Sequence, residues 1–148
     1  MRIYIDQSVK IENTNRATAI GLSNRIQFVV RIPAAVKKHL QREFRRRGKR
    51  RLFVFRTFIA GVVLTLQHAP LHGRSSVVID LEYPGLEKVL YSMFFEMWSR
   101  ISTDMPVIEF RRVGKRSKAH EVSHKTATGQ RTADKTISYE EIRPLALK

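Results

Sequence analysis

The sequence contains no cysteine, which excludes disulfide bonds, thiol catalysis and thiolate metal sites. It also lacks a long apolar run, because the longest such stretch, residues 58–66, contains Thr65 and follows Arg56. A membrane-spanning helix needs about 20 apolar residues, so the sequence predicts no membrane partner. A signal peptide is not expected either, since Asp6 interrupts the apolar start of the chain, and this favours a cytoplasmic protein.

Acidic side chains are scarce as well. The 148 residues include 28 Lys and Arg but only 13 Asp and Glu, which gives a formal net charge of +15. Such a surface attracts polyanions through counterion release, so nucleic acid, as RNA, DNA or a hybrid duplex, is the predicted partner.

The length suits one domain over residues 1–148, with a flexible tail expected at residues 143–148.

The first half of the chain predicts three strands followed by two helices. The strands are expected as an antiparallel meander over residues 2–8, 17–22 and 26–32. The third is the clearest, because apolar side chains occupy every second position from Ile26 to Ile32. After Pro33 the apolar spacing changes to four, which predicts a basic amphipathic helix, and a second helix is favoured over residues 52–67.

The second half predicts strand, helix, strand, loop and helix, over residues 75–81, 86–101, 107–113, 114–130 and 131–142. The fold class expected from the whole chain is therefore mixed α/β, with a five-stranded mixed sheet flanked by helices. The helix at 86–101 has a wide apolar stripe, because Tyr91, Phe95 and Trp98 extend its apolar face. That stripe can be buried between sheet and helix, or it can be a homodimer surface.

Three aspartates occupy positions where solubility does not explain them. Asp6 and Asp80 each close a short apolar strand, and Asp134 follows Ala133 near the predicted last helix. Two of them have a plainer interpretation: Asp80 can serve the turn at Pro84, and Asp134 can pair with Arg131 or Lys135.

The order of elements and these three positions resemble the ribonuclease H-like superfamily. Asp6 resembles the aspartate of the family's first strand, and Asp80, with Tyr83 three residues later, resembles that of its fourth strand. Asp134 is similar to the aspartate that opens the family's last helix. His124, in the preceding predicted loop, is placed like the family histidine that moves protons, and its plainer interpretation is a solvent-facing loop histidine.

The resemblance implies a nuclease that uses Mg²⁺ or Mn²⁺, with Asp6, Asp80 and Asp134 as metal ligands and His124 beside them. One departure concerns the family's fourth carboxylate, because Arg56 occupies the place where a glutamate is expected. Glu82, two residues beyond Asp80 on the same side of an extended strand, is a candidate replacement, and Glu43 is another. A second departure is an extra basic helical segment, residues 34–51, after the third strand.

Two basic clusters are the expected contacts to the phosphate backbone. The first lies in the extra segment and comprises Arg42, Arg45, Arg46, Arg47, Lys49, Arg50 and Arg51. The second precedes the predicted loop and comprises Arg111, Arg112, Lys115, Arg116 and Lys118. The expected function is cleavage of phosphodiester bonds in an RNA-containing or structured duplex. The alternative is a nucleic-acid-binding protein of the same fold whose metal site has degenerated.

Overall fold

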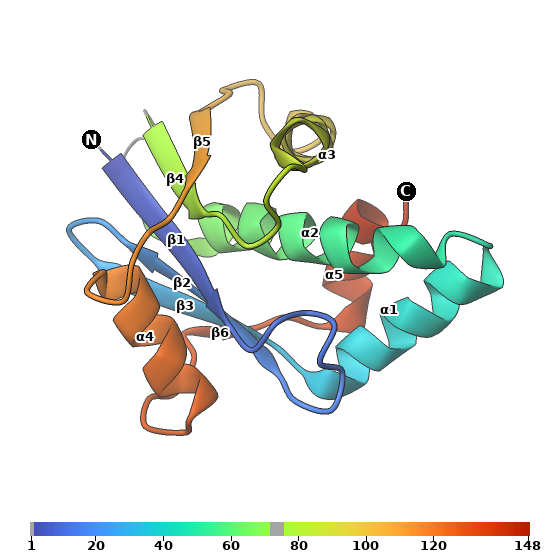
Figure 1. Cartoon of the computed structure of the whole chain (residues 1–148), viewed down its shortest axis with the longest axis horizontal. Helices are drawn as coiled ribbons and strands as arrows, with labels where there is room; N and C mark the ends of the chain where they lie inside the picture. The colour runs from blue at the N-terminus through green and yellow to red at the C-terminus, as the bar shows by residue number, and fades with distance from the viewer. Residues whose placement is uncertain (1, 72–75) are drawn as a thin grey trace.

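A six-stranded mixed sheet forms the centre of the molecule in the computed structural model, which describes residues 2–71 and 76–148 (Figure 1). Its strand order is β5-β4-β1-β2-β3-β6. The antiparallel meander is confirmed, with β1 (Arg2–Ser8), β2 (Thr18–Ser23) and β3 (Gln27–Ile32). Strands β4 (Ser76–Asp80) and β5 (Val107–Arg111) continue the sheet parallel to β1. Ser75, where the fourth strand was predicted to begin, lies outside the described residues.

Helices cover both faces of the sheet. Adjacent residues of β2 point to opposite faces, and Ile20 meets Gly61 of α2 (Phe53–His68) whereas Gly21 meets Ala119 of α4 (Lys118–Ala127). The α2 face also carries α1 (Ala34–Arg46), the short 3₁₀ helix η1 (Arg50–Leu52), α3 (Glu87–Ser99) and α5 (Tyr139–Ala146). The main hydrophobic core therefore lies between the sheet and α2, with α4 alone on the other face (Figure 1).

The predicted helical segment at 34–51 is confirmed as α1 followed by η1, and the predicted helices at 52–67 and 86–101 are confirmed as α2 and α3. The predicted loop at 114–130 is wrong, because it contains α4. That helix buries only three residues of its own, Ala119, Val122 and Ser123, so it has no broad apolar stripe. The last helix, predicted over 131–142, begins later than expected, because the chain first forms β6 (Lys135–Thr136) parallel to β3 and α5 begins at Tyr139.

The end of the chain is packed rather than a free tail. Helix α5 continues to Ala146, and Leu145, Ala146 and Leu147 are buried. The guanidinium of Arg56 donates hydrogen bonds to the carbonyl oxygens of Leu145, Ala146 and Lys148. The prediction of a flexible tail at 143–148 is therefore wrong, since a buried cation holds these carbonyl groups.

The apolar stripe of α3 is divided between core and surface. Trp98 is 1% exposed and its indole N–H donates to the carbonyl of Asp104 at 2.7 Å, so it cannot belong to a homodimer surface. Tyr91 and Phe95 remain exposed on the outer side of the helix. Over the two described ranges, every helix is too short or too polar to cross a membrane.

Candidate metal centre

Three carboxylates meet at the ends of the two central parallel strands. Asp6 lies near the end of β1, Asp80 is the last residue of β4, and Glu82 follows two residues later. Because Ile5 pairs with Ile79, Asp6 and Asp80 lie side by side on the α4 face. One oxygen of each carboxylate lies within 4.8 Å of the others. The sequence prediction is matched for Asp6 and Asp80, and Glu82 completes the cluster.

Each aspartate is held in place by a hydrogen bond from the chain around it. The Oδ2 atom of Asp6 lies 2.8 Å from Nδ1 of His120, in the first turn of α4, and its Oδ1 accepts from the backbone N–H of Gln7. The Oδ1 atom of Asp80 accepts from the backbone N–H of Val113 at 2.8 Å. The Glu82 side chain interacts with those of Asp80 and Gln7, so its carboxyl group is held toward the two aspartates.

The position of His120 depends on how closely α4 approaches the sheet. A Cβ at Gly21 would lie 2.5 Å from the carbonyl oxygen of Ala119 and 2.7 Å from Cγ1 of Val122, so only glycine allows this approach. Gly21 is the partner of Asp6 in the β1–β2 pairing. The absence of a side chain on β2 therefore brings His120 against the carboxylate on β1.

Crowding and burial change the acidity of the cluster. Burial and the neighbouring charge of Asp80 raise the pKa of Asp6 to about 6, although the hydrogen bond and charge of His120 oppose this. Burial and the adjacent Asp80 raise the pKa of Glu82 to about 8. Both shifts mean that the negative charges are poorly compensated by the protein itself. A bound cation would compensate them, and an all-oxygen set of carboxylates suits Mg²⁺ or Mn²⁺.

The carboxylates line a cavity of about 280 Å³ with a basic rim. Arg112 and Lys115, from the segment between β5 and α4, line the same cavity, and both are exposed to solvent. Two members of the second basic cluster predicted from the sequence, Arg112 and Lys115, thus lie beside the carboxylates. Cations and acids face one space, which suits a bound phosphodiester in contact with a metal ion.

Asp134 does not join the cluster, and its prediction as a metal ligand is wrong. Its Oδ2 accepts from the backbone N–H of Val29 and from Arg131, while its own N–H donates to the carbonyl of Val29. Since Val29 lies on β3, the whole of β2 separates Asp134 from Asp6. The plainer interpretation, an ion pair with Arg131, is correct.

His124 is also outside the cavity. It lies one turn beyond His120 on α4, exposed, with its ring stacked on that of His120 at 5.9 Å between centroids. The sequence does not point to His120, because the pattern of residues 114–130 predicts a loop. Ser117 was the available signal: its hydroxyl accepts from the N–H of Ala119 and caps α4, placing His120 in the first turn.

Arg56 does not occupy the metal centre. It is 8% exposed, and besides the α5 carbonyls it contacts Glu96 of α3 at 3.1 Å. Glu43, the other candidate replacement ligand, is engaged by Arg46 on the outer end of α1. Of the two candidate replacement ligands, Glu82 lies in the carboxylate cluster and Glu43 does not.

The first basic cluster lies far from the carboxylates. Arg42, Arg45, Arg46, Arg47, Lys49, Arg50 and Arg51 are exposed at the α1–η1 end, opposite α4 along the longest axis of the molecule (Figure 1). The two predicted clusters thus do not flank the carboxylates from two sides, because only the residues between β5 and α4 border them.

Comparison with known proteins finds no family model, curated protein or solved structure that matches the chain.

Proposed function

We propose that the protein is a divalent-metal-dependent nuclease of ribonuclease H-like fold that hydrolyses phosphodiester bonds in nucleic acid. The observation that carries the proposal is the convergence of Asp6, Asp80 and Glu82 within 4.8 Å, beside Arg112 and Lys115 in one cavity. The resemblance drawn from the sequence agrees with two features: the first and fourth strands are neighbours, and a helix after the fifth strand approaches their ends.

The three carboxylates would hold Mg²⁺ or Mn²⁺, which when bound makes a water nucleophilic and neutralises charge on the leaving oxygen. Asp6 and Asp80 are fixed by hydrogen bonds before any ligand arrives, so little ordering is left to occur on binding. Arg112 and Lys115 orient the phosphodiester by charge. His120 holds Asp6 through Nδ1, and its Nε2, which bonds to none of the described residues, can accept or donate a proton at the cavity.

The alternative, nucleic-acid binding without cleavage, is favoured by the net charge of +15 and by the basic surface far from the carboxylates. Asp80→Asn separates the two functions, because it removes a ligand charge but keeps the shape and the acceptor for Val113. We expect Mg²⁺- or Mn²⁺-dependent cleavage of RNA, DNA or hybrid substrates by the wild type, at least about 100-fold slower in the variant, with binding retained.

The matched control is Asp134→Asn, an equivalent change at an aspartate outside the cluster, which should leave cleavage unchanged in folded protein. His120→Ala should slow cleavage much more than His124→Ala, since only His120 contacts the cluster. A wild type that binds these substrates but cleaves none of them with either ion would rule out the nuclease and support the binding function.

A further inference from the structure

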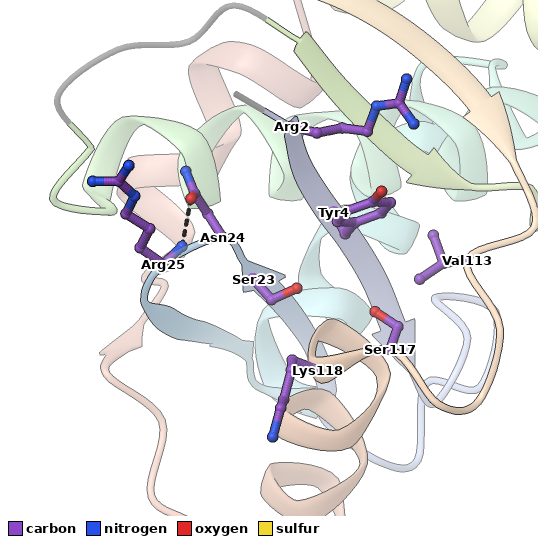
Figure 2. A pocket seen from close by; sticks show the side chains of 8 residues that line it. All are labelled: Arg2, Tyr4, Ser23, Asn24, Arg25, Val113, Ser117 and Lys118. Carbon is purple, nitrogen blue, oxygen red and sulfur yellow. Dashed lines mark hydrogen bonds between the residues drawn. The ribbon is translucent and has the colours of Figure 1, made fainter.

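A second and larger cavity lies on the same face of β1 as the carboxylates. Its volume is about 750 Å³, and Figure 2 shows Tyr4 near its middle, with Ser23 of β2 and Ser117 before α4 below it in the view. Tyr4 and Asp6 are two residues apart on one strand, so their side chains leave the same face about 7 Å apart. That separation is comparable to one nucleotide of an extended strand.

The rim of this cavity is positively charged. Arg2 at the start of β1, Arg25 in the β2–β3 turn and Lys118 at the start of α4 line the cavity, and Figure 2 shows the charged ends of Arg25 and Lys118 on its outer side, pointing away from Tyr4. The lining contains no acidic residue. Among the described residues, none of the three cations forms an ion pair, although Lys118 lies in the field of Glu121 one turn on. Three unpaired cations from three elements attract an anion with several negative groups.

The two cavities share one wall. Val113, Ser117 and Lys118 line the larger cavity, whereas Arg112, Gly114 and Lys115 of the same segment line the carboxylate cavity. The segment is anchored to the cluster, because the N–H of Val113 donates to Asp80. A polymer that lies across this segment therefore places one unit over Tyr4 and the next phosphate over the carboxylates.

The combination of a half-buried aromatic ring with surrounding cations fits a single-stranded nucleic acid rather than a duplex. Aromatic side chains bind unpaired bases by stacking, and cations track the backbone on either side. A base inside a duplex is covered on both faces by its neighbours and cannot lie against a tyrosine within a cavity. A volume of about 750 Å³ also suffices for a nucleotide-sized ligand.

We propose that this cavity binds an unpaired nucleotide of the substrate strand, next to the phosphodiester at the carboxylates. Tyr4 stacks on the base, and Arg2, Arg25 and Lys118 hold the flanking phosphates. The proposal rests on the proposed function for the identity of the neighbouring site. It narrows the substrate to single strands, or to duplexes with an unpaired segment at the cleavage position.

The test measures binding without cleavage, in EDTA, with oligonucleotides that carry the fluorescent base 2-aminopurine in an unpaired segment. RNA and DNA versions are compared, because both offer the same base and phosphate chemistry. We expect emission to be quenched on binding by wild type and by Tyr4→Phe. With Tyr4→Leu we expect quenching to be lost and affinity to fall about tenfold, as for the loss of one base–aromatic stack.

Arg25→Ala should also weaken binding of the unpaired segment, and the matched control is Lys88→Ala on α3, outside this cavity, which should not. Blunt duplexes of equal length should bind Tyr4→Leu and wild type equally. If folded Tyr4→Leu binds and quenches like wild type, or if no quenching occurs in wild type with RNA or DNA, the proposal is wrong.

The outcome is independent of catalysis. Tyr4-dependent quenching in a protein that cleaves nothing would support the nucleotide site and overturn the nuclease. Metal-dependent cleavage that is unchanged by Tyr4→Leu on every substrate would support the nuclease and overturn the nucleotide site.

Discussion

The acidity of Glu82 and Asp6 links the cluster to the stability of the protein. Their pKa values in the folded state, about 8 and about 6, lie above the ordinary values of 4.5 and 3.8. A raised carboxyl pKa means that the folded state binds more protons than the unfolded state between the two values. The contribution of such a group to the free energy of unfolding is fully present below its ordinary pKa. It is lost as the pH rises through its pKa in the folded state.

We therefore predict that the metal-free protein becomes less stable between about pH 5 and pH 8, mainly through Glu82. The lowered pKa values of Glu43, Glu96 and Glu121 act below this window and do not cancel the effect. Added Mg²⁺ or Mn²⁺ should raise Tm more at pH 8 than at pH 6, because protons compete with the ion. Thermal unfolding at several pH values, with metal or EDTA, measures this.

Glu82→Gln is the control for this dependence. It removes the group with the largest shift, so the metal-free decline should become shallower and the Tm gain from metal smaller. A decline of the same slope in this variant would mean that Glu82 is not the titrating group.

Sequence reasoning located the residues of the cluster that follow recognisable strands. Asp6 and Asp80 each end a short apolar run, and the resemblance to the ribonuclease H-like superfamily implied that their strands are neighbours. Period two added Glu82 on the side of Asp80. The prediction of Asp134 as a metal ligand failed because its position depends on a two-residue strand that pairs with the edge of β3. His120 was missed because its contact with Asp6 spans 114 residues, and no local pattern encodes such a contact.

At the level of elements, the position of α4 is decided by one glycine on β2. Elements with strong periodicity, such as β3 and α3, were predicted from sequence, whereas α4 was not, because its contact with the sheet uses small residues. Ala119 and Gly21 provide close approach instead of a wide apolar stripe. The helix that carries His120 therefore depends on tertiary packing more than on its own sequence pattern.

Gly21→Ala is predicted to separate His120 from Asp6. The new methyl group would meet the backbone carbonyl of Ala119 at 2.5 Å, so α4 must move away from the sheet. Such overpacking costs about 1–3 kcal/mol. In protein that remains folded, metal-dependent cleavage should fall by about tenfold or more, measured alongside urea unfolding.

Gly61→Ala is the matched control on the opposite face. Its new methyl group would approach Cδ1 of Ile20, the flexible end of a side chain, and not α4. It should lower stability without reducing cleavage by folded protein. Equal losses of cleavage in both variants would show that general destabilisation, and not the position of α4, is responsible.

Arg56 is predicted to stabilise the end of the chain rather than to affect the metal centre. Its guanidinium bonds to three carbonyl groups at the end of α5, and charged hydrogen bonds of this kind contribute more than neutral ones. Arg56→Met should cost about 2–4 kcal/mol in urea unfolding. Arg56→Glu, which restores the carboxylate expected by resemblance, should destabilise the protein without raising its affinity for Mg²⁺.

Arg100→Met is the comparison for Arg56→Met, because Arg100 also contacts Glu96 and an α5 carbonyl, that of Pro144, but from an exposed position. Its cost should stay below about 1 kcal/mol. If Arg56→Glu instead tightens Mg²⁺ binding, α2 does contribute to the metal centre.

On the scale of the whole molecule, positive charge is divided between two ends. The residues between β5 and α4 border the carboxylates, whereas the cluster of the extra segment lies at the α1–η1 end (Figure 1). Nothing in the sequence indicated this separation, because the distance between two basic segments depends on the direction of α1. A nucleic acid long enough to reach both ends would contact phosphates at each of them, with different consequences for cleavage.

Neutralising the distant end should weaken binding without slowing the chemical step. For Arg45, Arg50 and Arg51, all exposed and changed together to Gln, we expect the slope of log affinity against log salt to decrease by about 0.7–0.9 for each lost phosphate contact. Cleavage at saturating substrate should stay within about twofold of wild type, because these residues lie away from the scissile phosphate. Arg46 is left unchanged, since Glu43 already engages it.

The matched change near the carboxylates is Arg112→Gln with Lys115→Gln. It should lower cleavage even at saturation, because these cations line the cavity proposed to hold the reacting phosphodiester. Salt titrations of binding and saturation kinetics on substrates of increasing length therefore separate the two ends. If the distant variant keeps the full salt dependence on the longest substrate, nucleic acid does not reach the α1–η1 end, and its seven exposed cations serve a different partner.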